Sequence, residues 1–203
     1  MFLGIPVPVL RSLVKEHDGL PPREAAKLLR SAFHEERLFA LLALVRAFTR
    51  GSEPEKKKIF ALYLGNARFI NSWDLVDLSA PAIVGGYLAG RGRSRLYALA
   101  GSNNVWKRRI AVLATFAFIR TDDYADALKI AEKLLGDGHD LIHKAVGWML
   151  REIGKRDRRT EEKFLLLHYK KMPRTVLRYA IERFPEARRK KYLKGTIREK
   201  KSV

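Results

Sequence analysis

The fold is indicated most clearly by one stretch, Glu35–Arg50, which reads EERLFALLALVRAFTR. Leu38, Leu41, Leu42 and Val45 recur at spacings of three and four residues, which places them on one face of a helix. The same pattern predicts further helices over 55–64, 105–118, 124–135, 141–153, 161–169 and 175–184.

The residues between these stretches are typical of helix ends. Gly51, Gly136 and Gly154 follow predicted helices, and prolines stand near predicted starts. No stretch shows the alternation of a strand. The sequence therefore predicts an all-α protein.

The predicted helices form pairs joined by short loops, and the pairs recur every 35 to 45 residues or so, the period of HEAT-like repeats. No strict repeat is visible, so we expect an α–α superhelix (solenoid) of degenerate repeats with a concave basic face. Residues 1–203 are predicted to form a single domain, in which the basic tail at 188–203 frays.

The charge favours a polyanionic partner. Lys and Arg number 41 against 22 Asp and Glu, a formal net charge of +19. Nucleic acid is the first expectation, an anionic membrane surface the second and an acidic protein the third. The absence of cysteine excludes disulfides, thiolate metal sites and cysteine nucleophiles.

Neither a signal peptide nor a membrane span is expected. Met1–Leu10 is apolar but has no basic region and contains Pro6 and Pro8. The longest apolar run, Ile110–Ile119, is too short for a bilayer, which needs about 20 residues. We expect a soluble, cytoplasmic protein.

The positive charge is concentrated in places. Residues 78–121 contain no Asp or Glu. Glycines in this stretch allow a close backbone approach to a ligand. A mobile loop at Gly90–Arg95 beside a phosphate backbone is one interpretation, and an ordinary solvated loop is the other. The cations of the stretch are Arg91, Arg93, Arg95, Lys107, Arg108, Arg109 and Arg120, and a second cluster comprises Arg188, Arg189, Lys190, Lys191 and Lys194.

The segment Asn71–Asp77, NSWDLVD, is the strongest candidate for a site. Ser72 is a good helix N-cap, and Trp73 and Asp77, four residues apart, share one helix face. The spacing alone leaves two interpretations open. Either the pair lines a functional cleft, or Trp73 packs in the core and Asp77 pairs with an arginine.

Two further tryptophans, Trp106 and Trp148, lie beside cationic residues on later helices. In a stacked solenoid, equivalent helices line one surface, so such residues can converge. His139 and His143 lack a third ligand and are interpreted as structural. No Walker A loop or G-x-G-x-x-G is present, so a nucleotide-driven enzyme or a metallohydrolase is not expected.

Taken together, three blocks resemble the AlkD-like DNA glycosylases, the HEAT-like DNA alkylation repair enzymes. The resemblance implies that Asp77 is catalytic and that Trp73 and Trp148 face the deoxyribose. It implies that Arg109 belongs to the site, with Arg108 as the alternative if the register slips by one, and that Trp106 is structural. The blocks are NSWDLVD (71–77), WKRRIA (106–111) and KAVGWMLRE (144–152), supported by GIPVP (4–8), HEER (34–37) and MPR (172–174).

The resemblance also implies an activity and a partner. The activity is release of cationic N3- and N7-alkylpurines, such as 3-methyladenine and 7-methylguanine, from double-stranded DNA, without cofactor or metal, by a monomer that acts without a base-binding pocket. One departure is that the chain starts near the family's second helix. The residues expected to contact DNA are Lys107, Arg108, Arg91, Arg93, Arg95, Lys144, Arg151, Arg188 and Arg189.

Two other functions remain open at this stage. One is a non-catalytic module of the same fold that binds bent or branched DNA. The other is a protein-binding α-solenoid, which predicts no salt-dependent affinity for DNA.

Overall fold

The computed structural model describes residues 1–197, and residues 198–203, the end of the expected basic tail, lie outside the described part. Every regular element in residues 1–197 is helical, which confirms the all-α prediction. The helices are α1 (Val7–Glu16), α2 (Pro22–Leu28), α3 (His34–Arg50), α4 (Glu53–Gly65), α5 (Trp73–Asp77), α6 (Gly86–Leu88), α7 (Ser94–Ala100), α8 (Val105–Ala114), α9 (Phe116–Ile119), α10 (Ala125–Leu134), α11 (Asp140–Arg156), α12 (Arg158–His168), α13 (Arg174–Ala180) and α14 (Glu186–Leu193), with 3-10 turns at Ala67–Phe69 and Ile181–Arg183 and a π-helical turn at Pro81–Gly85.

Three sequence expectations need correction. The helix predicted over 105–118 breaks at Thr115. The Thr115 hydroxyl donates to the Val112 carbonyl at 2.6 Å, and this side-chain bond competes with the backbone hydrogen bonds of a helix. Arg95 lies in α7 and not in the loop predicted around it. Residues 188–193, expected to fray, belong to α14, which is anchored by the fully buried Tyr192.

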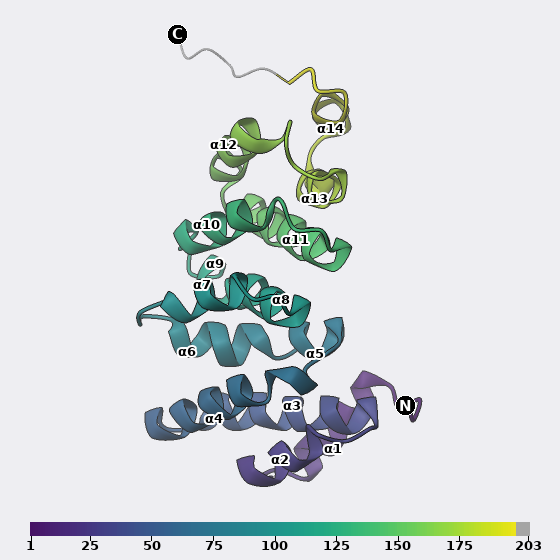
Figure 1. Cartoon of the computed structure of the whole chain (residues 1–203), viewed down its shortest axis with the longest axis vertical. Helices are drawn as coiled ribbons and strands as arrows, with labels where there is room; N and C mark the ends of the chain where they lie inside the picture. Colours follow the sequence, from purple (N-terminus) through teal and green to yellow (C-terminus); the bar gives the residue numbers. More distant parts are fainter. Residues whose placement is uncertain (198–203) are drawn as a thin grey trace.

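The helices stack in two layers along the long axis of the molecule (Figure 1). In what we call the first layer, α1 packs on α3, α3 on α5, α5 on α8, α8 on α11 and α11 on α13. In the second layer, α2 packs on α4, α4 on α6 and α7 on α10. Contacts across the layers, such as α2 with α3 and α7 with α8, enclose a continuous apolar core. The architecture is an α–α superhelix, as predicted.

Glycine serves this packing. A Cβ at Gly85 would lie 2.2 Å from the Ala114 carbonyl oxygen, so only glycine lets the π-helical turn approach α8 this closely. The sequence interpretation gave such glycines a role beside a ligand, whereas Gly85 is buried against protein backbone. No helix in residues 1–197 has the length and apolar character needed to cross a bilayer.

Candidate active site

The central element of the site is α5, a helix of five residues. Its Leu75 and Val76 are fully buried and hold the helix on the core. Ser72 occupies the N-cap position but does not cap the backbone, which corrects the expected role. Its hydroxyl instead donates to Asp74 Oδ1 at 2.6 Å.

Asp74 and Asp77 leave α5 in different directions. Asp74 Oδ2 lies 2.6 Å from His34 Nε2 at the start of α3. Asp77 accepts two hydrogen bonds from Arg109 of α8, from Nε at 2.8 Å and from Nη2 at 2.7 Å. The two carboxylates therefore tie this short helix to both of its neighbours in the first layer.

Arg109 is a buried arginine that makes three hydrogen bonds within the protein. Besides holding Asp77, it donates through Nη1 to the Leu141 carbonyl of α11. Its side chain is only 6% exposed, against 11% for Asp77. The resemblance implied only that Arg109 belongs to the site. In the structure it fixes the Asp77 carboxylate and joins α5, α8 and α11.

Burial governs the protonation of Asp77. Desolvation raises the pKa of its carboxyl above the ordinary value, hydrogen bonds and charge from Arg109 lower it in part, and the nearby Asp74 charge raises it further. For Asp74, burial also raises the pKa, but hydrogen bonds from Ser72 and His34 outweigh it and the net direction is downward. Asp77 is thus the less well solvated of the two carboxylates.

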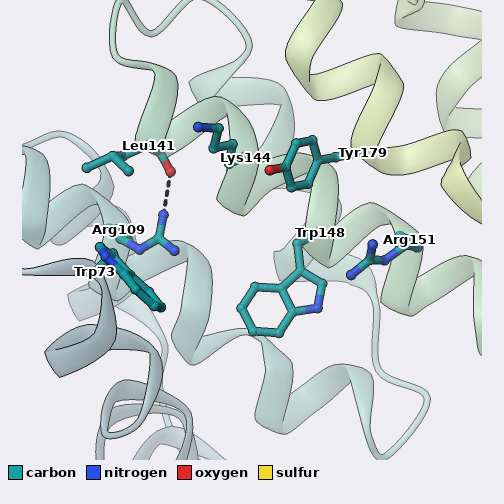
Figure 2. A pocket seen from close by; sticks show the side chains of 7 residues that line it. All are labelled: Trp73, Arg109, Leu141, Lys144, Trp148, Arg151 and Tyr179. Atoms are coloured by element: carbon teal, nitrogen blue, oxygen red, sulfur yellow. Dashed lines mark hydrogen bonds between the residues drawn. The ribbon is translucent and has the colours of Figure 1, made fainter.

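A pocket of about 440 Å³ lies beside this pair, between α5, α8, α11 and α13 (Figure 2). Trp73 is 57% exposed on one side of it, so the interpretation in which this indole packs in the core is wrong. Asp77 is not among the lining residues within residues 1–197, but it is bonded to Arg109, which does line the pocket. The lining residues are Trp73, Arg109, Leu141, Lys144, Trp148, Arg151 and Tyr179.

Trp148 is held in one orientation. Its Nε1–H donates to Glu152 Oε1 one helical turn along α11, at 2.9 Å, and Lys155 contacts the same oxygen at 2.6 Å. Phe116 packs near the indole in a tilted arrangement, with ring centroids 6.2 Å apart. The structure therefore brings Trp73, Arg109 and Trp148 to one pocket, while Trp106 packs against the core.

Tyr179 is a pocket residue that sequence reasoning missed. It reaches the pocket because α13 lies very close to α11: a Cβ at Gly147 would be 2.5 Å from Tyr179 Cβ and 2.6 Å from the Val176 carbonyl oxygen. Figure 2 shows the Tyr179 hydroxyl and the Lys144 ammonium on the same side of the pocket. Gly147, within the block KAVGWMLRE, is the one sequence signal for this approach.

The cations that line the pocket are balanced by carboxylates. Arg109 pairs with Asp77, and Lys144 with Asp140 at 2.8 Å. Arg151 pairs with Glu182. The pocket is therefore aromatic and close to electrically neutral, although the chain as a whole is strongly basic.

Several residues predicted to contact DNA lie elsewhere and are engaged by acids. Arg93 bonds Asp123 and Asp126, each at 2.7 Å, and Arg91 pairs with Glu53. These pairs belong to the α4, α6–α7 and α10 region of the second layer, away from the pocket.

Other predicted contacts divide into paired and free cations. Arg108 bonds Asp137 at 2.6 Å and two loop carbonyls, and Arg188 pairs with Glu162. Lys107, Arg95 and Arg189 have no carboxylate within ion-pair distance in residues 1–197. The same residues contain no group of three or more His, Cys, Asp or Glu placed to hold a metal ion.

The two-layer helical stack, with a pocket walled by two tryptophans, defines a class, the α–α superhelical proteins. The chain belongs to the DNA alkylation repair enzyme family, whose model matches residues 1–184. This membership confirms the resemblance drawn from the sequence, supports a role in DNA repair and implies DNA binding. No curated protein matches the chain.

Two solved structures share the fold. One is described as a predicted DNA alkylation repair enzyme from Enterococcus faecalis, with a TM-score of 0.70 and 20% identity over 92% of this chain and 89% of that one. The other is AlkD2 from Streptococcus mutans, with a TM-score of 0.65 and 16% identity over 91% and 92% of the two chains.

Proposed function

We propose that the protein is a DNA glycosylase that hydrolyses the N-glycosidic bond of cationic N3- and N7-alkylpurines in duplex DNA. Family membership supports the DNA repair role. The observation that carries the finer proposal is the buried Asp77 carboxylate, held by Arg109, which itself lines a neutral pocket whose walls are Trp73 and Trp148.

A purine alkylated at N3 or N7 is positively charged, and it becomes neutral when it leaves with the electrons of its bond to C1′. The sugar then carries the positive charge, as an oxocarbenium-like ion. A fixed carboxylate beside C1′ stabilises this charge, and a single well-placed electrostatic group is worth about 3–4 kcal/mol. Because burial raises the pKa of Asp77, its charge is poorly solvated and gains from an arriving cation.

The tryptophans complete the environment. An indole face attracts a cation by about 0.5–2 kcal/mol, and both rings shield the sugar from bulk water. Water attacks C1′, Asp77 orients it, and the proton lost from the water passes to the carboxylate or to solvent. Since the leaving base is already cationic, no general acid is required, which suits a site where Asp77 has no acid partner.

The test is release of free base from methylated duplex DNA, scored by mass spectrometry for 3-methyladenine and 7-methylguanine. The unmodified protein should release both, and Asp77→Asn should slow release by at least 100-fold while it still binds DNA, since a single electrostatic group is worth about this much. Asp74→Asn is the matched control, because it makes the same change on the same helix but points toward His34.

The outcomes separate the alternatives. If the unmodified protein binds DNA but releases no base, the non-catalytic DNA-binding module replaces the glycosylase. If its binding to DNA is absent or independent of salt, the protein-binding solenoid is favoured. If Asp77→Asn and Asp74→Asn release base equally fast, Asp77 is not the catalytic group.

A further inference from the structure

A second groove, of about 380 Å³, lies in the first layer between α1 and α3. Its floor is apolar, and it includes Leu78, the residue directly after α5. Among residues 1–197, four cations line it and no acidic residue does, and these cations are Arg11, Lys15, Arg46 and Arg50. We call it the N-terminal groove.

The charge of the N-terminal groove is incompletely neutralised. Arg46 bonds Asp18 through Nε and Nη2, each at 2.7 Å, and Arg50 bonds the same carboxylate. Hydrogen bonds from Arg46 hold the pKa of Asp18 well below its usual range, so it stays ionised. Arg11 and Lys15, four residues apart on α1, have no carboxylate within ion-pair distance in residues 1–197. Arg46 and Arg50 therefore share one carboxylate, and the charges of Arg11 and Lys15 are unpaired within residues 1–197.

This groove and the pocket beside Trp73 differ in chemistry. The pocket is walled by aromatic rings and its cations are paired one by one, which suits a cationic sugar and base. In the described part of the chain, no aromatic residue lines the N-terminal groove, and its excess of positive charge suits phosphate groups. Lysine and arginine side chains of this kind position a nucleic acid backbone without reading its sequence.

The two sites lie on one continuous layer. The pocket is lined from α5, α8, α11 and α13, and the groove from α1, α3 and the residue that ends α5. These six helices pack in sequence as the first layer (Figure 1). A duplex that places a nucleotide in the pocket and follows this layer toward the N-terminus therefore passes over α5 and reaches the groove.

We propose that the N-terminal groove binds the sugar–phosphate backbone of the DNA on one side of the lesion only. The inference rests on the proposed function for its partner and extends it to the position of the duplex. Helix axes in contact are about 8–10 Å apart, so three steps from α8 to α1 span roughly 24–30 Å. At about 3.4 Å per nucleotide along one strand, the contacted phosphates lie roughly seven to nine nucleotides from the lesion.

The first test measures binding of a fluorescein-labelled, undamaged duplex by anisotropy at 50 to 200 mM salt. Arg11→Gln/Lys15→Gln removes the two unpaired charges, and Lys57→Gln/Lys58→Gln removes two exposed charges from α4 in the second layer. Each lost phosphate contact lowers the log–log salt slope by about 0.9, so the groove variant should lose about 1.8. When salt is raised over this fourfold range, the groove variant should lose affinity by a factor that is roughly 12 times smaller than the factor lost by the unmodified protein. A groove variant whose slope equals that of the α4 variant overturns the proposal.

The second test uses 7-methylguanine duplexes in which one arm, on either side of the lesion, is shortened to about four base pairs, well short of the groove. In the unmodified protein, only one of the two truncations should lower kcat/KM, and kcat at saturating DNA should stay unchanged. The groove variant should be insensitive to that truncation. Equal effects of both truncations contradict the one-sided assignment. If no base is released at all, the proposed function fails, and the salt slope still decides whether the groove binds DNA.

Discussion

Replacing Arg109 with methionine leaves the Asp77 carboxylate buried without its cationic partner. The two hydrogen bonds between them, at 2.8 and 2.7 Å, join side chains that are 6% and 11% exposed. Removal of one member of a buried ion pair costs about 3–5 kcal/mol, because the remaining charge stays desolvated. We expect Arg109→Met to lower the free energy of unfolding by this amount at neutral pH.

The loss should depend on pH with a definite sign. Burial already raises the pKa of Asp77 in the folded protein, and removal of Arg109 raises it further because Arg109 lowers it. Between the ordinary aspartate pKa of about 3.9 and this raised value, the folded state holds more protons than the unfolded state. Stability is therefore greatest below the ordinary pKa and falls as pH rises, by up to about 1.4 kcal/mol per pH unit.

The assay is urea unfolding followed by circular dichroism from pH 5 to pH 8 at constant ionic strength. The deficit of Arg109→Met relative to the unmodified protein should shrink toward pH 5. The double variant Asp77→Asn/Arg109→Met, which buries no charge, should recover part of the stability and lose this pH dependence. A deficit of the same size at every pH, or a double variant as unstable as the sum of the single ones, refutes the reasoning.

Further predictions concern the walls of the pocket and one buried acid. Gly147→Ala should lower stability by about 1–3 kcal/mol, seen as a lower Tm, because its Cβ would lie 2.5 Å from Tyr179 Cβ; an unchanged Tm contradicts the close packing. Glu152→Leu should slow base release and change the fluorescence of Trp148. Glu152→Gln can still accept a hydrogen bond from the indole N–H, so both effects should be much smaller. Equal effects of the two variants argue against a positioning role of Glu152. Burial raises the pKa of Glu161 to about 8, so the free energy of unfolding should fall from pH 5 to pH 8. Glu161→Gln should make this fall smaller. If the free energy of unfolding of the variant falls with pH as steeply as before, Glu161 is not its source.

The sequence predicts the local part of the site well. The spacing of Trp73 and Asp77 and the apolar pair between them predict a short helix with one buried face, and the structure has it. The spacing alone left open whether Asp77 faces a cleft or an arginine. In the structure Trp73 and Arg109 line the pocket, whereas Asp77 pairs with Arg109 and is not among the lining residues.

The sequence does not predict which cations are neutralised. Arg93 and Arg108 lie in a stretch without acids, yet Asp123 and Asp137 from the following repeats reach them through space. Such pairing depends on how the helices stack and not on nearby residues in the chain. The same limit applies to Tyr179, whose place in the pocket depends on the distance between two helices.

The five-residue length of α5 affects how the site loses its structure on warming. A helix this short is not stable alone, because nucleation is costly and few backbone hydrogen bonds repay it. Only a few bonds, such as Val76 N–H to the Ser72 carbonyl at 3.2 Å, close its turn. Hydrogen exchange of the α5 amides should therefore report the local opening of this turn. On warming, the turn that carries Trp73 and Asp77 is expected to melt locally while most of the helical stack is still folded.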